Sequence, residues 1–442
     1  MTLSIRLRAL SRLRLRTLRA HSYRWQRRLI FAAGGLIVGL LAVALALCAN
    51  EAQGLFKQLA ARWPYAPLLI TPLGFGLAAF MVGRYFPNTQ GSGIPQAIAA
   101  KDADDPQDRA GLVGPRVAIG KILLTLLGLM VGASTGREGP TVQVGASVMH
   151  AMGRLSPRRQ PGLIIAGAAA GVAAAFNTPL AGIVFAIEEM SRSFEVRASG
   201  LIIGTVILAG LTAQMFSGDY TYFGTSNAVL RIGTAWMAVP LCGVIGGLAG
   251  AAFARILVAV PDALPARPRQ WIADNSVVFA ALCGLGVALC GLASGGSVYG
   301  TGYEQARAVL HNTGPMPLYY PPLKFLATAL SSVSGVPGGI FSPSLSIGGG
   351  IGAMVALLFH HAAPGPIVLL GMVAFFTGVV RAPITGFVIV SEMSGDHSIL
   401  VALMAAALIA EVCARFISRQ GVYHLLSRRF MNVGNGRTAA EH

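Results

Sequence analysis

Apolar blocks long enough to cross a lipid bilayer recur along this 442-residue chain. Two examples are LIFAAGGLIVGLLAVALALCA (29–49) and VFAALCGLGVALCGLA (278–293). A bilayer core needs roughly 20 apolar residues per helix, and most of these blocks lack the polar face that a soluble helix keeps in water. Since 54% of the residues are hydrophobic and only 12% are charged, the sequence predicts an all-α polytopic membrane protein and argues against a soluble domain.

Much of the formal net charge of +17 lies in a basic leader, residues 1–28. This leader is too long and too arginine-rich for an ordinary signal peptide. Its spacing allows a basic amphipathic helix on anionic headgroups, with a disordered segment as the equal alternative; nucleic-acid binding is a weaker interpretation. Because arginine-rich flanks usually face the cytoplasm, we expect a cytoplasmic N-terminus and an inner (plasma) membrane location.

The chain contains an internal repeat with a shift of 203–204 residues. Residues 121–147, KILLTLLGLMVGASTGREGPTVQVGAS, align without gaps on residues 324–350, KFLATALSSVSGVPGGIFSPSLSIGGG. A second pair follows in the same order, TPLAGIVFAIEE (178–189) on APITGFVIVSEM (382–393). The coinciding residues include the pairs Lys121/Lys324, Gly136/Gly339, Pro140/Pro343 and Glu188/Glu392.

This repeat predicts two similar transmembrane halves, 29–217 and 234–424, with 218–233 as the linker and 425–442 as a cytoplasmic tail. Repeats with interrupted apolar segments at matching positions are typical of transporters whose binding site lies between the halves near the midplane. We expect the halves to be inverted, although the alignment itself does not show their orientation.

The interruptions GSGIP (91–95), GREGP (136–140) and GGIFSP (338–343) share one layout, glycines followed by a proline. We expect each proline at the first position of a new helix, where its missing N–H costs nothing. The free N–H groups and positive dipole ends of three such helices could together hold an anion, without a lysine that would bind it too tightly for release. The alternative is that these segments are ordinary tight turns.

Glu138 lies in GREGP, at the start of one of these predicted helices. A charged side chain at the centre of a membrane helix costs about 2.5–3.5 kcal/mol, so this carboxylate is a functional candidate. An ionised Glu138 could occupy the anion site itself, whereas a protonated Glu138 could swing away, so that a proton and an anion would compete for one place. Its neighbour Arg137 is expected to point away and form structural hydrogen bonds, for example to carbonyls at helix ends.

Taken together, these motifs resemble the CLC family of chloride channels and chloride/proton antiporters. GSGIP, GREGP and GGIFSP occur in the family's order, TPLAGIVFAIEEM (178–190) follows the second motif, and a tyrosine, Tyr423, comes near the end. The resemblance covers residues 29–426 and implies a homodimer with one pore per subunit and no cofactor. It is closest to bacterial members without a nucleotide-binding CBS pair, so no ATP regulation is expected.

The resemblance also implies roles for individual residues. Ser92 and Tyr423 would contact the central chloride with their hydroxyls, and Ile340 and Phe341 with their backbone N–H groups. Glu138 would be the external gating glutamate. Protons and chloride would share one route near this residue.

Glu189 resembles the internal glutamate that passes protons from the cytoplasmic side. Its neighbour Glu188 aligns with Glu392 across the repeat, so we expect Glu188 to be structural and Glu189 to be the relay. Lys121 and Lys324 could tune the local field or form structural hydrogen bonds.

One departure concerns Gln96, Ala97 and Ile98, which follow GSGIP where carboxylates are expected in bacterial exchangers. If those carboxylates balance the positive charge of the GREGP arginine in the relatives, other groups must balance the charge of Arg137 here.

The leading hypothesis is an electrogenic chloride/proton antiporter, and the first alternative is a passive chloride channel of the same fold. The presence of Glu189 favours exchange, because channels of the family generally lack a glutamate there. Ser92 favours chloride, because nitrate-preferring members carry proline at this position. An intramembrane enzyme is disfavoured, because the sequence has neither an HExxH motif nor a Ser–His pair in repeat-related positions.

Overall fold

The computed structural model describes residues 2–153, 160–191, 200–218, 221–224, 230, 233–262, 264–311, 313–314 and 316–438. These residues form helices and connecting turns, and no β-strand occurs among them. By length and composition, six helical stretches of the described chain could cross a membrane: Arg28–Arg62, Pro67–Arg84, Pro106–Met130, Gly200–Ser217, Thr234–Val260 and Ser276–Ala293. The predicted all-α polytopic class is confirmed.

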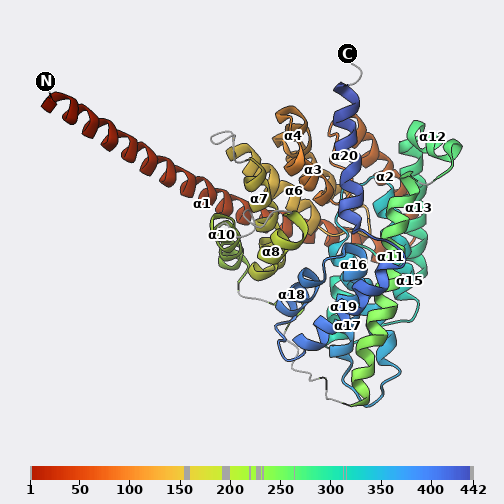
Figure 1. Ribbon diagram of the computed structural model, residues 1–442. Coiled ribbons are helices and arrows are strands. Elements are labelled where there is room, and N and C mark those ends of the chain that lie inside the picture. The colour runs from red at the N-terminus through yellow and green to blue at the C-terminus, as the bar shows by residue number, and fades with distance from the viewer. Residues whose placement is uncertain are drawn as a thin grey trace.

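The helices of the first half differ widely in length, from α1 with 61 residues to α8 with 7. They are α1 (Thr2–Arg62), α2 (Pro67–Arg84), α3 (Ile94–Asp102), α4 (Pro106–Val113), α5 (Pro115–Met130), α6 (Glu138–Met152), α7 (Gln160–Phe176), α8 (Pro179–Phe185), a π-helical turn (Ala186–Met190) and α10 (Gly200–Ser217). Helix α1 includes the basic leader, and Figure 1 shows its N-terminal part extending away from the bundle.

The rest of the chain has a similar series of helices. It contains a 3₁₀ turn (Thr234–Met237), α11 (Ala238–Asp262), α12 (Ala266–Asp274), α13 (Ser276–Ala293), α14 (Tyr303–Leu310), α15 (Tyr320–Val333), α16 (Phe341–Ala356), α17 (Pro364–Val380), α18 (Pro383–Ser394), α19 (Leu400–Arg415) and α20 (Val422–Thr438). In Figure 1 the green-to-blue helices of this half lie mostly on one side of the molecule, with α2 of the first half beside α13.

Glycines allow neighbouring helices to cross at backbone contact, and they do so at matching positions of the two halves. A Cβ on Gly145 of α6 would lie 2.2 Å from the carbonyl oxygen of Gly167 on α7. A Cβ on the repeat partner Gly348 of α16 would lie 2.5 Å from the carbonyl oxygen of Gly371 on α17. Close packing of this kind stabilises helix pairs in lipid, where the hydrophobic effect between helices is lost.

Aligned residues of the two halves contact each other reciprocally. Gly136 N–H donates to the Gly339 carbonyl and Gly339 N–H donates to the Gly136 carbonyl, both at 2.7 Å, in an antiparallel pair. Because each residue gives its partner the contact that it receives, a local two-fold axis relates the two segments. The inversion of the halves relative to a membrane stays a prediction.

The proline positions need a correction. Pro95 is the second residue of α3, while Pro140 and Pro343 are the third residues of α6 and α16. The expected first position is therefore wrong by one or two residues. The physical reason still holds, because every N–H of the first helical turn lacks a helical acceptor. The shift makes Glu138 and Phe341 the first residues of their helices.

Candidate functional site

The three interrupted segments meet at one place, although they lie far apart in the sequence. The N–H of Gly338 donates to the carbonyl of Gly91 at 3.0 Å, which joins the start of α16 to the start of α3. A Cβ on Gly139 would lie 2.4 Å from Ser92 Oγ and 3.2 Å from the Cα of Gly339, so the start of α6 lies against both. The first turns of α3, α6 and α16 are thereby brought together.

Buried lysines fix the loops that lead into two equivalent helices. Lys121 Nζ donates to the carbonyls of Thr89 and Gly91, at 2.8 and 2.6 Å, just before α3. Lys324 Nζ donates to the carbonyls of Val298 and Gly300, at 2.9 and 2.7 Å, just before α14. Both lysine side chains are fully buried. The structure therefore shows structural hydrogen bonds for this repeat-related pair, which is one of the two roles expected from the sequence.

The predicted hydroxyl groups line a cavity of about 330 Å³, which we call the Ser92 cavity. Its walls include Ser92, Ile340, Tyr423 and Arg429. Ser92 Oγ and Tyr423 Oη are buried without a hydrogen-bond partner, although the two hydroxyls lie close enough to interact. The Tyr423 ring stacks on Phe341, with centroids 6.0 Å apart and planes at 14°. Two unpaired hydroxyls and the start of α16 thus share one wall.

Glu138 is fully buried at the first position of α6. Its Oε1 accepts a hydrogen bond of 3.3 Å from the hydroxyl of Tyr222, and its Oε2 has no hydrogen-bond partner. An ionised Glu138 was expected to occupy the anion site at the helix starts, whereas the described contact of its carboxylate is a tyrosine from segment 221–224. Tyr222 and Arg137 also line a second cavity of about 610 Å³, which we call the Arg137 cavity.

Glu138 therefore lies between the two cavities, with Tyr222 on the side of the Arg137 cavity and Ser92 on the other. Residue 138 thus lies beside lining residues of both cavities, because Tyr222 contacts its carboxylate and the next residue, Gly139, lies against Ser92.

Arg137 points away from the helix starts, as expected. Its Nη1 donates to the carbonyl of Ala46 at 2.7 Å and to the side-chain oxygen of Asn50. Both partners lie on α1, well inside the helix and not at its end. Neutral oxygens thus take the place of the carboxylates that the sequence lacks after GSGIP.

The adjacent glutamates Glu188 and Glu189 have different surroundings. The Glu188 carboxylate accepts from the N–H groups of Ile384 and Thr385 at the start of α18, at 3.1 and 2.6 Å. Its repeat partner Glu392 accepts from the N–H groups at the start of α8 in the same way, at 3.1 and 2.6 Å. The prediction that Glu188 is structural is confirmed.

Glu189 is 5% exposed, and its Oε1 lies 3.6 Å from Nδ1 of His424. The His424 side chain is 30% exposed, so it connects the buried carboxylate with the surface near α20. The hydroxyl of Tyr423, the preceding residue, lies within electrostatic range of both Glu189 and Glu138. Both predicted proton-handling glutamates thus lie near the predicted anion ligand.

Comparison with known proteins decides the family. The family model for the voltage gated chloride channel matches residues 74–415. The chain belongs to the CLC family. It is 31% identical to the H(+)/Cl(-) exchange transporter ClcA of Yersinia pseudotuberculosis serotype IB over 426 residues, which cover 90% of this chain and 86% of that protein. It is 29% identical to ClcA of Klebsiella pneumoniae strain 342, over 93% of this chain and 90% of that protein.

Solved CLC structures agree with the fold. A slow cyanobacterial Cl⁻/H⁺ antiporter superposes with a TM-score of 0.77 at 26% identity, over 93% of this chain and 99% of that one. A CLC-type fluoride/proton antiporter superposes with a TM-score of 0.78 at 21% identity, over 90% and 97% of the two chains. At that identity the second likeness supports the CLC fold alone.

Two side chains of this candidate site, Tyr222 and His424, were not predicted from the sequence. Tyr222 lies in the segment predicted as a linker, and a lone tyrosine in YTYFG has no spacing that connects it to GREGP. His424 directly follows Tyr423, so its position beside a proposed ligand was the one available signal.

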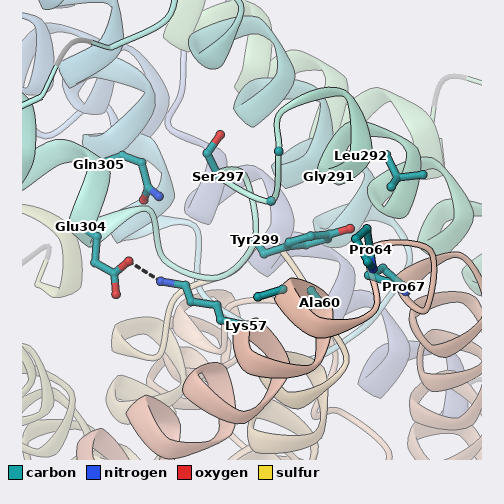
Figure 2. A pocket seen from close by; sticks show the side chains of 13 residues that line it. Lys57, Ala60, Pro64, Pro67, Gly291, Leu292, Ser297, Tyr299, Glu304 and Gln305 are labelled. Atoms are coloured by element: carbon teal, nitrogen blue, oxygen red, sulfur yellow. Dashed lines mark hydrogen bonds and ion pairs between the residues drawn. The ribbon is translucent and has the colours of Figure 1, made fainter.

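A further cavity of about 500 Å³ lies between α1 and α14. Figure 2 shows Lys57 reaching across it to form an ion pair with Glu304. Both residues also line the Arg137 cavity, so the pair ties the two halves together at its edge. The described lining residues of this further cavity include none of the predicted ion-binding side chains.

Proposed function

We propose that this chain is a secondary active antiporter that exchanges chloride for protons across a membrane. The observation that carries the proposal is the buried Glu138 carboxylate, which lies between two cavities at the point where three helix starts meet. The relatives named as H(+)/Cl(-) exchange transporters and the solved Cl⁻/H⁺ antiporter support exchange over a passive channel.

Chloride would bind at the hydroxyls of Ser92 and Tyr423 and at the N–H groups of Ile340 and Phe341. The unpaired state of both buried hydroxyls supports this assignment, because burial without a hydrogen-bond partner costs free energy that an anion would recover. Helix starts add partial positive charge without a full cationic ligand. The bound ion could therefore leave again.

Coupling would arise because the ionised Glu138 carboxylate and chloride exclude each other. Two negative charges in one poorly hydrated site repel strongly, so arrival of chloride favours protonation of Glu138, and protonation favours chloride. A glutamate that carries its proton in one direction while chloride passes in the other would convert this competition into antiport.

Protons would reach the site from the face of α20 through Glu189. The exposed edge of His424 beside the buried Glu189 supports this route, since a partly exposed imidazole can exchange protons with water near neutral pH. Tyr423 lies within range of both glutamates, so the two routes would meet at the chloride ligand.

The proposed assembly is a homodimer with one pore per subunit in the inner (plasma) membrane, with both termini in the cytoplasm. The arginines of residues 1–28 support this orientation. Residues 29–217 and 234–424 would form the two inverted halves, with 218–233 between them and a tail from 425. Helix α20 runs across the start of that tail, to Thr438. We propose chloride and protons as the transported partners, with neither a cofactor nor nucleic acid.

The experiment is proton pumping in liposomes loaded with chloride. An outward chloride gradient should drive protons inward against their own gradient, at a rate that a pH electrode records. Chloride efflux without proton movement would contradict antiport and establish the passive channel instead.

A further inference from the structure

Tyr222 comes from the segment that joins the two halves, yet it reaches the most buried carboxylate of the site. Its side chain is 3% exposed, and its hydroxyl donates to Glu138 Oε1 at 3.3 Å. The ring is held by edge-on contacts with Phe176 and Tyr303, at centroid distances of 5.7 and 4.9 Å. These contacts fix the orientation of the ring, and therefore the direction in which its hydroxyl points.

A second hydroxyl lies on the other side of the Tyr222 oxygen. Ser342 Oγ, in the first turn of α16, lies 3.4 Å from the Tyr222 oxygen. A tyrosine hydroxyl has one proton, and Tyr222 gives it to the carboxylate, so Ser342 must donate to Tyr222. The chain Ser342 to Tyr222 to Glu138 polarises each bond toward the carboxylate and favours the ionised form.

We propose that Tyr222 is a positioning residue that holds the ionised Glu138 carboxylate at the edge of the Arg137 cavity and sets how readily proton and chloride displace it. The inference rests on the proposed function and deepens it. Because donation stabilises the ionised form, loss of the hydroxyl should let Glu138 take up its proton at higher pH. It should also let chloride compete better, because the carboxylate is held less firmly.

Other charged or titratable groups near Glu138 are engaged elsewhere or lie farther away. Helices α7 and α16 carry none. On α3, Lys101 and Asp102 pair with each other at the far end of that helix, and on α5 Lys121 is bound to loop carbonyls. The charged or titratable groups that line the Arg137 cavity with Tyr222 are Lys57, Arg137, Tyr303 and Glu304, and Tyr423 lies within electrostatic range of Glu138. Among the described residues, the hydrogen bond to the carboxylate comes from Tyr222.

The test is Tyr222→Phe, which keeps the packed ring and removes only the hydroxyl. Coupled transport is measured in liposomes as a function of pH and of chloride concentration. The midpoint of the pH profile should move up by about 0.5–1 unit, and the chloride concentration for half-maximal rate should fall by about three- to tenfold, the effect of one ordinary hydrogen bond. A merely structural role would lower the rate at every pH and leave the midpoint in place.

Two further variants serve as a control and as a second test. Tyr303→Phe removes the hydroxyl from the ring that contacts Tyr222. The Tyr303 hydroxyl accepts a hydrogen bond from Arg307 at 3.3 Å and has no described bond to Glu138, so the midpoint of the pH profile should stay at the wild-type value. Ser342→Ala removes the donor behind Tyr222 and should shift the midpoint in the same direction by less. It also provides the readout if Tyr222→Phe fails to fold.

The outcomes separate the two proposals. Wild-type protein that moves chloride without protons would contradict the antiporter. Coupled wild-type protein whose pH midpoint stays unchanged in both Tyr222→Phe and Ser342→Ala would overturn only the role of Tyr222. A shift of equal size in Tyr303→Phe would overturn it as well, because the effect would then belong to the aromatic packing.

Discussion

The internal repeat provides a matched pair of variants, Lys121→Met and Lys324→Met. Each lysine is fully buried and donates to two carbonyls of the loop before a short helix. The loop held by Lys121 carries Ser92, a proposed chloride ligand, whereas the loop held by Lys324 carries Thr301 at the equivalent position. Loss of either lysine should disturb its own loop, but only one loop should matter for chloride.

The expected cost follows from the hydrogen bonds. Methionine fills a similar apolar volume without a donor, so Thr89 loses its partner, while Gly91 keeps the N–H of Gly338. One unsatisfied buried carbonyl and one lost bond cost about 2–4 kcal/mol, and relief of the buried ammonium offsets part of that cost. We therefore expect a net loss of about 1–3 kcal/mol in the free energy of unfolding for Lys121→Met. The loss should be larger for Lys324→Met, because Val298 and Gly300 both lose their donor.

Chloride binding distinguishes the two variants. Thermal unfolding in detergent should show both variants destabilised, Lys324→Met the more, whereas calorimetry should show chloride affinity reduced by about tenfold or more in Lys121→Met alone. Equal loss of chloride affinity in Lys324→Met, or unchanged affinity in Lys121→Met, would refute the reasoning that these lysines act through the loops that they hold.

Further variants separate coupling from stability. Glu138→Ala should uncouple proton movement while chloride flux persists, because no carboxylate remains to compete; proton pumping by this variant in liposomes would contradict the role. Glu189→Gln should abolish proton movement without weakening chloride binding, which calorimetry measures. Glu188→Gln should lower stability by about 1–2 kcal/mol through loss of the α18 cap, with coupling retained, and uncoupling would argue against a purely structural residue. Gly139→Ala should displace Ser92, since its Cβ would lie 2.4 Å from Ser92 Oγ, and weaken chloride binding; normal affinity would show that α6 can shift away.

The repeat made part of this site predictable. Alignment of Glu188 with Glu392 separated two adjacent carboxylates before their contacts were known, and the structure shows both residues capping the helix of the opposite half. The glycine-proline layout also located the three helix starts to within two residues. Glycine and proline restrict or free the backbone locally, so a few consecutive residues are enough to predict such a start.

Other features depend on distant parts of the chain and leave no local pattern. Tyr222 is 84 residues from Glu138, and His424 is on a different helix from Glu189. The exact helix starts were also missed, because tertiary contacts such as the Gly136–Gly339 pair decide where the first turn begins. Pattern and propensity constrain such boundaries only to within a few residues.

The central claim is that chloride and the ionised Glu138 carboxylate occupy one place in turn. Calorimetric titration of chloride in buffers of different ionisation enthalpy measures the protons taken up per anion bound. The account predicts net proton uptake on chloride binding by the wild-type protein and none by Glu138→Gln. Chloride binding without proton uptake, or uptake that persists in Glu138→Gln, would contradict it.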